Sequence, residues 1–201
     1  MSQRPRPHPE PPADFDSLDL PISRRARRWF RTYRCRREPV FFGTSRSSRF
    51  DDPKGKFGVL YLATELEGAF VEGCLVDSGL GMTGPLLGER FLRSRCLAEI
   101  RFSKPINVVD LTGSGLAAIG ADARLSSGDY QTAQRWSRAI WSHPRRPDGI
   151  MYRSRHNPQL LCAAVFDRTP ETTVTNRGPF LGPGLIAHTA AFLDTYGVGL
   201  G

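Results

Sequence analysis

The apolar residues of this chain fall into short runs, and this limits the folds that the chain can adopt. Runs of about six residues bounded by Gly, Pro or polar residues are typical of short buried strands. The predicted strands are residues 32–35, 39–42, 58–63, 97–102, 106–111, 149–153 and 161–166. None of these runs approaches the ~20 apolar residues that a membrane-spanning helix needs, so we expect no membrane association.

Helical patterns lie between these strands. The predicted helices are residues 64–76, 114–120, 129–141 and 185–196. Thr64 and Glu67 have the spacing of a capping box, Asp129 can cap the third helix, and Gly197 can end the last one. Because strands and helices interleave, the predicted class is α/β (α+β), a single domain whose mixed sheet of short strands is flanked by helices. The strands are too short and the connections too irregular to predict a doubly wound sheet.

Residues 1–21 differ in composition from the rest of the 201-residue chain. This segment contains six prolines, namely Pro5, Pro7, Pro9, Pro11, Pro12 and Pro21. It is short of backbone donors and of apolar side chains, so we expect a flexible, loosely attached arm followed by one domain over residues 22–201. The segment lacks the apolar core of a secretory signal.

The cysteines give no sign of a metal site. Cys35, Cys74, Cys96 and Cys162 are widely spaced and form no CxxC or Cys/His cluster. This spacing argues against zinc and against a disulfide scaffold. We therefore expect reduced, mostly buried thiols in a cytoplasmic protein, with no bound metal.

The charge balance favours an anionic partner. The net charge is +8, and 25 arginines outnumber three lysines. Arginine binds phosphates and carboxylates through a two-pronged fork, so nucleic acid, an acidic protein and a phosphorylated small molecule are all candidates. Residues 24–37 carry eight arginines and no acid. This run is either a nucleic-acid patch or, as we favour, the end of an amphipathic helix packed through Trp29, Phe30 and Tyr33.

The short motifs of common enzymes are missing. The chain has no GxGxxG after a strand, no GxxxxGK[ST], no GxSxG and no HExxH, and its four histidines lack metal-ligand spacing. Four longer stretches carry polar and aromatic residues at predicted strand ends, where ligand groups collect in α/β sheets. They are TYR with Arg34, RSSRF with Arg49, YLATELEGAFVE with Tyr61 and Glu72, and DGIMYRSRH with Ser154.

Taken in order, these stretches resemble the RES domain family, a bacterial family named for its Arg, Glu and Ser residues. The family pattern is Tyr-Arg at a strand end, an Arg-Phe loop, Tyr-Leu-Ala with a Glu eleven residues after the Tyr, and a later D-G-I-x-Y-x-S-R. The matching residues here are Tyr33-Arg34, Arg49-Phe50-Asp51, Tyr61-Leu62-Ala63, Glu72, Asp148-Gly149-Ile150, Tyr152, Ser154 and Arg155. The resemblance covers about residues 30–198. At its first position both Arg31 and Arg34 fit.

The resemblance implies a fold related to ADP-ribosyltransferases and an NAD-degrading toxin. Its reaction would be hydrolysis or phosphorolysis of NAD, which is a substrate here and not a cofactor. The implied partner is an Xre-type antitoxin with a DNA-binding helix-turn-helix, so nucleic acid would be reached only through the antitoxin. A homodimer is a further assembly to consider. The alternatives are an ADP-ribosyltransferase that modifies a protein or nucleic acid, and an Arg-rich nucleic-acid-binding module that would not need Glu72.

The residue types suit NAD cleavage. Breaking the nicotinamide–ribose bond develops positive charge on the ribose, which the carboxylate of Glu72 can stabilise. Arg34 and Arg49 can bind the pyrophosphate through charge-assisted forks. Tyr61 offers a ring face to nicotinamide or a hydroxyl to the ribose, and Ser154 can hydrogen-bond the nicotinamide amide or a ribose hydroxyl. We therefore predict Glu72, Tyr61 and Ser154 as catalytic residues and Arg34, Arg49, Tyr61 and Ser154 as substrate-binding residues.

Overall fold

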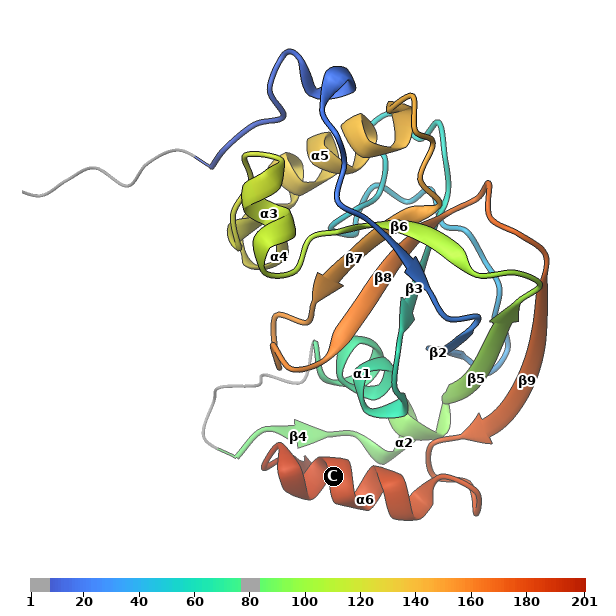
Figure 1. The fold of residues 1–201 in the computed structure, drawn as a ribbon. Helices are drawn as coiled ribbons and strands as arrows, with labels where there is room; N and C mark the ends of the chain where they lie inside the picture. The colour runs from blue at the N-terminus through green and yellow to red at the C-terminus, as the bar shows by residue number, and fades with distance from the viewer. Residues whose placement is uncertain (1–7, 77–83) are drawn as a thin grey trace, which may run out of the picture.

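The computed structural model describes residues 8–76 and 84–201, and a mixed sheet is its central element (Figure 1). The sheet has the order β1-β6-β7-β8-β3-β2-β5-β9. Its strands are β1 Ile22–Arg25, β2 Arg28–Arg34, β3 Val59–Ala63, β5 Arg95–Phe102, β6 Ile106–Asp110, β7 Gly149–Arg153, β8 Leu161–Phe166 and β9 Thr172–Pro179. The β6–β7 pair is parallel and the other pairs in this sheet are antiparallel. The predicted α+β class with a mixed, short-stranded sheet is confirmed.

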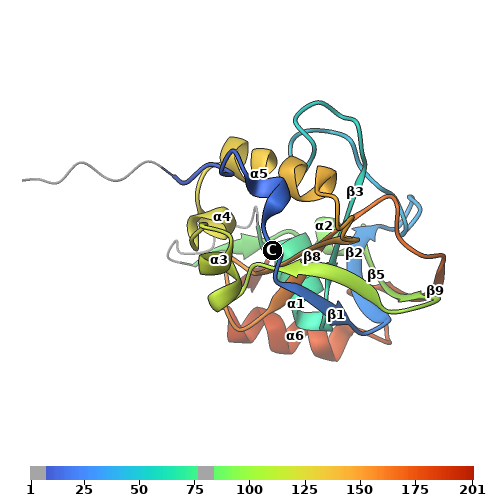
Figure 2. The same cartoon turned by 45° about the horizontal axis from the view of Figure 1, so that its top comes forward.

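The helices gather at two ends of the sheet. In Figure 1, α5 lies above the strands with α3 and α4 at its left end, whereas α1 and α6 lie lower, and the turned view in Figure 2 keeps the two groups apart. The helices are η1 Phe15–Ser17, α1 Leu66–Phe70, the π-helical turn η2 Val71–Leu75, α2 Glu89–Arg93, α3 Ser114–Ala118, α4 Arg124–Ser127, α5 Tyr130–Ser142 and α6 Ile186–Thr195. A small parallel pair, β4 Leu86–Leu87 and β10 Gly199–Leu200, accompanies α6. No helix in the described ranges is long and apolar enough to cross a membrane.

Alternation along the strands divides the core between the two faces of the sheet. On β3, Tyr61 and Ala63 face the larger cluster, which includes Phe70 of α1, while Leu60 and Leu62 face the smaller one. Successive residues of a strand point to opposite faces, so each central strand has a buried side chain on both faces. This alternation sends Tyr61 to the same face as the helix that carries Glu72.

The proline-rich segment differs from the expected loose arm over the residues that are described. Phe15 is buried, and its ring packs edge-on against Trp136 of α5 with ring centroids 5.5 Å apart. The indole Nε1 of Trp136 donates to the Pro9 carbonyl at 2.8 Å, and Arg135 pairs with Glu10. A few apolar and polar anchors are therefore enough to hold residues 8–21 on the domain, whereas residues 1–7 lie outside the described ranges.

The arginine-rich run forms strands rather than the end of a helix, so the favoured interpretation of this run is wrong. Trp29 and Tyr33 of β2 both pack into the smaller core cluster. Two residues four apart share a face in a helix and also in a strand, so this spacing does not separate the two structures. The run instead pairs with β5, from Arg28↔Arg101 to Arg34↔Arg95, and this pairing shows that it is a strand.

Two local predictions also differ from the structure, and one strand was missed. Residues 39–42 form no strand, and one isolated bridge joins Gly43 to Val59 beside them. The edge strand β9 was not predicted, because its side chains are mostly exposed and polar and show no apolar alternation. Thr64 does not cap α1, since its hydroxyl donates to the Leu161 carbonyl at 3.2 Å. Asp129 does cap α5, accepting from the Thr132 amide at 2.8 Å.

Two of the four cysteines form a disulfide. Cys35, which follows β2, is bonded to Cys96 of β5, and their Cα atoms are 5.0 Å apart. The expectation of four reduced thiols is therefore wrong for this pair, because antiparallel pairing brings together residues that are 61 positions apart in the sequence. Cys74 and Cys162 are free and buried, as predicted.

Gly73 allows η2 to lie directly against β2. A Cβ atom at this position would stand 2.3 Å from Cβ of Thr32. Replacing a helical glycine by alanine ordinarily gains about 1 kcal/mol of helix propensity. Here we expect Gly73→Ala to lower the free energy of unfolding by about 1–3 kcal/mol, because the overpacking outweighs that gain.

Chemical denaturation of the Gly73→Ala variant measures this change. Gly184→Ala is the matched control, since the nearest atom to its added Cβ lies 3.9 Å away. Equal stability of Gly73→Ala and the wild type would contradict the close approach of η2 and β2.

Candidate active site

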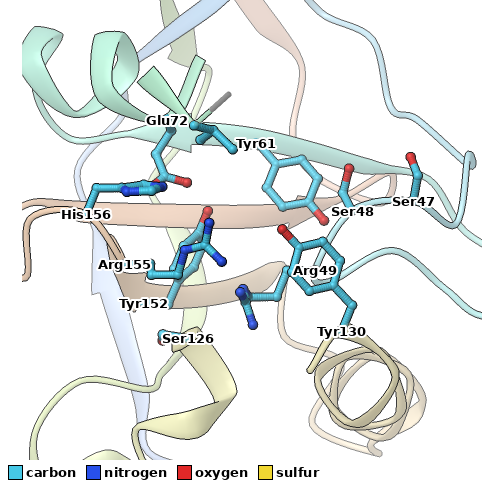
Figure 3. Close-up of a pocket in the computed structure, with 11 residues that line it drawn as sticks. Ser47, Ser48, Arg49, Tyr61, Glu72, Ser126, Tyr130, Tyr152, Arg155 and His156 are labelled. Carbon is cyan, nitrogen blue, oxygen red and sulfur yellow. The ribbon is translucent and has the colours of Figure 1, made fainter. Parts of the chain in front are cut away.

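A cavity of about 420 Å³ opens on the face of the sheet that carries α1 and η2 (Figure 3). This volume lies within the usual range for small-molecule sites. The cavity is lined by Ser47, Ser48, Arg49, Tyr61, Glu72, Val76, Ser126, Tyr130, Tyr152, Arg155 and His156. These residues come from the loop before β3, from β3, η2 and β7, and from the region of α4 and α5. Sequence positions more than 100 residues apart therefore meet at one site.

Glu72 projects its carboxylate into this cavity from η2. The Ser154 hydroxyl donates to Glu72 Oε1 at 2.5 Å, and Ser154 in turn accepts from the His156 amide at 3.3 Å. Ser154 is buried, so it holds the carboxylate from behind while the cavity side stays open. A π-helical turn in place of a regular helix is common at functional sites. Here it sets the position of Glu72 relative to the strands.

The hydroxyl of Tyr61 is already used by the protein. It donates to Asp51 Oδ1 at 3.0 Å and accepts from the Phe50 amide at 2.9 Å. Burial, and next the negative charge of Asp51, raise the pKa of Tyr61 well above its usual value of 10.0, so the phenol stays neutral. Tyr61 therefore offers its ring to the cavity rather than its hydroxyl.

The loop that supplies Arg49 is fastened to α5. Gln134 Nε2 donates to the carbonyls of Arg46 at 2.9 Å and Ser48 at 3.0 Å. The Ser137 hydroxyl donates to the Phe50 carbonyl at 2.7 Å. Satisfied polar contacts of this kind fix a loop that has few apolar side chains of its own.

Arg49 lies in the cavity wall, and part of its guanidinium is hydrogen-bonded to the backbone. Its Nη1 donates to the Gly128 carbonyl at 2.8 Å, and its Cζ lies 4.5 Å from the ring centroid of Tyr130. Burial lowers the pKa of Arg49 from its usual value of 12.5, and the group stays charged at neutral pH. Five N–H donors are available on a guanidinium, so donors remain for an anion in the cavity.

Arg31 and Arg34 both fit the first position of the sequence pattern, and the structure places them in different surroundings. Arg31 borders a smaller hollow of about 110 Å³ whose lining also includes Tyr61, Glu72 and Tyr152. Burial lowers the pKa of Arg31 to about 10. Arg34 is exposed at the far end of β2 and borders neither hollow. The structure thus brings Glu72, Ser154, Tyr61 and Arg49 together and leaves Arg34 outside.

Eight further lining residues were not predicted as site residues from the sequence, and four of them, Tyr130, Tyr152, Arg155 and His156, are aromatic or charged. Tyr152 is 5% exposed, and burial followed by the charge of Glu72 raises its pKa well above 10.0. Tyr152 and Arg155 belong to the D-G-I-x-Y-x-S-R stretch and His156 follows it, so the sequence pattern could have identified these three as site residues. No sequence pattern identified Tyr130 as a site residue, because its position at the start of α5 fits an ordinary apolar helix face.

The site combines one carboxylate with two guanidinium groups and several aromatic rings. Glu72 faces Arg155, Tyr152 and His156 across the cavity in Figure 3. Such a site can hold an anionic ligand and stabilise positive charge close to the carboxylate. Across residues 8–76 and 84–201, no group of three or more His, Cys, Asp or Glu residues could hold a metal ion.

Comparisons with known proteins agree with the family resemblance and with the fold. The family model for the RES domain matches residues 22–180. A probable toxin, y4kH of Sinorhizobium fredii (strain NBRC 101917 / NGR234), is 34% identical over 98 residues, which are 47% of this chain and 76% of that protein. One chain of the crystal structure of the M. tuberculosis MbcT–MbcA toxin–antitoxin complex superposes with a TM-score of 0.62. That match covers 88% of this chain and 92% of that chain at 16% identity, so it shows a shared fold.

The electrostatics of the cavity predict a neutral His156 at pH 7. Burial and then the adjacent positive charge of Arg155 lower its pKa below the usual 6.5, while Glu72 acts in the opposite direction. Because a nearby cation disfavours the imidazolium, Arg155→Gln is expected to raise the pKa of His156. An NMR titration of the histidine ring protons measures the shift, with His156→Gln for assignment and His188 as the internal control. An unchanged or lowered pKa would refute this arrangement.

Proposed function

The chain belongs to the RES domain family, and on this basis we propose that it is a toxin that cleaves the nicotinamide–ribose bond of cytoplasmic NAD. The observation that carries the proposal is the carboxylate of Glu72, held by Ser154 inside a cavity that also contains Arg49. A carboxylate beside guanidinium groups matches a substrate that develops positive charge on a ribose while carrying negative charge on its phosphates.

In the proposed reaction Glu72 stabilises the ribosyl cation. The glycosidic C–N bond breaks, and nicotinamide leaves as a neutral molecule with the bonding electron pair. Water or phosphate then bonds to the anomeric carbon, and a proton from water passes to solvent or to the carboxylate. A fixed charge is more effective than a mobile one because it needs no reorganisation in the transition state. The Ser154 hydroxyl, 2.5 Å from Glu72 Oε1, serves as the positioning group for that charge.

Substrate binding divides between the charged and the aromatic walls of the cavity. Arg49 and Arg155 are proposed to hold the pyrophosphate, Arg49 as a fixed fork and Arg155 as an exposed side chain that can follow the ligand. The ring of Tyr61 is proposed to stack on the nicotinamide riboside, since its hydroxyl is taken by Asp51. Tyr152 lines the cavity, and its hydroxyl is proposed to bond a ribose hydroxyl.

Hydrolysis, phosphorolysis and ADP-ribosylation share the first step. They differ only in the group that forms the new bond to the anomeric carbon. The proposal favours a small acceptor, water or phosphate. Incubation of the protein with NAD, with and without phosphate and with candidate macromolecular acceptors, distinguishes the three by their products: ADP-ribose, ADP-ribose 1-phosphate, or a labelled macromolecule.

Glu72→Gln tests the proposed role of the carboxylate. Glutamine keeps the shape of the side chain but removes its charge, so we expect the rate of nicotinamide release to fall about 10²–10³-fold while NAD binding is retained. Glu65→Gln, the same change at an exposed position before α1, is the matched control and should leave the rate unchanged.

Two results would oppose the proposal. Undiminished nicotinamide release by Glu72→Gln would remove Glu72 from the mechanism. The absence of nicotinamide release by the wild type with every acceptor would remove the enzymatic function itself.

We also propose that an Xre-type antitoxin inhibits the protein by covering this cavity, with carboxylate groups directed at Arg49 and Arg155. Charge complementarity at the rim governs such a contact. Addition of the antitoxin, sought as the product of the neighbouring gene, is expected to stop nicotinamide release. Arg155→Ala should weaken this inhibition more than Arg90→Ala, an exposed change on α2 away from the cavity. Equal inhibition of both variants would place the antitoxin elsewhere.

A further inference from the structure

A separate hollow, of about 490 Å³, lies at the opposite end of the sheet from Glu72. Its lining includes Arg24, Lys104, Asn107, Asp148 and Arg168. Asp148 precedes β7 and Ser154 follows it, so the two hollows are separated by roughly 20 Å of extended strand. The proposed NAD chemistry therefore makes no use of this end of the sheet.

Pairing between strands builds this separate hollow from distant parts of the chain. Arg24 of β1 lies opposite Asn107 of β6 in the strand register. The Asn107 amide donates to Asp148 Oδ2 at 2.7 Å, and the Asp148 amide donates back to the Asn107 carbonyl at 2.7 Å. Arg168, beyond the end of β8, donates from Nε and Nη2 to the Pro147 carbonyl at 3.0 and 2.7 Å. The cation of Arg168 is thus rigidly placed beside the strand ends.

Positive charge is in excess at this hollow. Three cations, Arg24, Lys104 and Arg168, line it together with one acid, Asp148. Among the described residues none of these three cations belongs to an ion pair. The backbone of Arg27, whose side chain is exposed, lies close to this region, because its carbonyl accepts from the Phe102 amide two residues before Lys104.

Three acids, Asp148, Asp167 and Glu171, lie near these cations. The carboxylate of Asp148 accepts from the Asn107 amide, and that of Asp167 accepts from the Gly58 amide at 2.8 Å. Glu171 is exposed, and its carbonyl accepts from the Ser103 amide at 2.8 Å. Burial, and next the charge of Arg146, lower the pKa of Arg168, while the charges of Asp148 and Asp167 act in the opposite direction.

We propose that this basic hollow binds the phosphate backbone of a nucleic acid directly and independently of the Glu72 cavity. Protein interfaces have an apolar, often aromatic centre, whereas nucleic acids are bound by polar and strongly basic surfaces. The lining of this hollow has two prolines and no larger apolar side chain, so its composition favours nucleic acid over an acidic protein.

The experiment compares two double variants of the full chain. Arg24→Gln with Lys104→Gln removes two exposed cations at the hollow, and Arg36→Gln with Arg37→Gln removes two exposed cations beyond the other end of β2. Arg168 is left in place because it packs over Trp141 and Phe166, and its loss would disturb the fold. The probe is a short fluorescein-labelled DNA duplex of arbitrary sequence, titrated by anisotropy over a series of salt concentrations.

Each phosphate contact contributes about 8-fold to affinity at 0.1 M salt, so the first double variant is expected to bind roughly 60-fold more weakly. The slope of log K against log salt concentration should fall by about 2, while the second double variant should change both quantities much less. Nicotinamide release by the first variant should equal that of the wild type. This readout separates the two sites, because a failure of the NAD proposal leaves duplex binding unaffected.

Three results would overturn the assignment. The wild type could fail to bind the duplex, or both double variants could lose affinity equally, which would indicate attraction by overall charge alone. Binding of polyglutamate that is lost in the Arg24/Lys104 variant, without duplex binding, would instead assign the hollow to an acidic protein.

Discussion

The close contact between η2 and β2 is the constraint on which the candidate active site depends. Gly73 has no side chain, so the π-helical turn can lie against Thr32, and the Thr32 hydroxyl donates to the Ala69 carbonyl at 2.6 Å. This contact places the neighbouring residue, Glu72, over the face of the sheet that carries Tyr61 and Tyr152. A bulkier residue at position 73 would push the carboxylate away from the strands.

The cavity is held in a single shape by polar groups that bind one another before any ligand arrives. Asp51 accepts from Tyr61, from the Ser45 hydroxyl at 2.9 Å and from the Ser48 amide at 3.1 Å. Ser154 holds Glu72 in the same way. Such preorganised groups stabilise developing charge without the cost of reorienting dipoles. The exposed Arg155 is the exception, and it is suited to follow a ligand or a partner.

The Glu72 cavity and the basic hollow lie at the two ends of one sheet, and their side chains differ in chemistry. At one end of β7, a carboxylate and aromatic rings form the site that is proposed to cleave a bond near a ribose. At the other end, cations from β1, the β5–β6 turn and the region after β8 form a site that suits phosphate. Both sites require the parallel β6–β7 pair and the antiparallel β7–β8 pair, because these pairings align the strand ends.

Local sequence patterns determined the strands β3, β5, β6, β7 and β8, the helices α5 and α6, and the order of motifs that includes Tyr61, Glu72 and Ser154. Apolar periodicity, the Asp129 cap and the left-handed conformation of Gly197 each depend on only a few neighbouring residues. Only the tertiary structure selected Arg31 over Arg34 as a neighbour of Glu72, added Tyr130 to the cavity, paired Cys35 with Cys96 and docked Phe15 on α5. These outcomes depend on strand register and on packing between distant segments, which local periodicity does not specify.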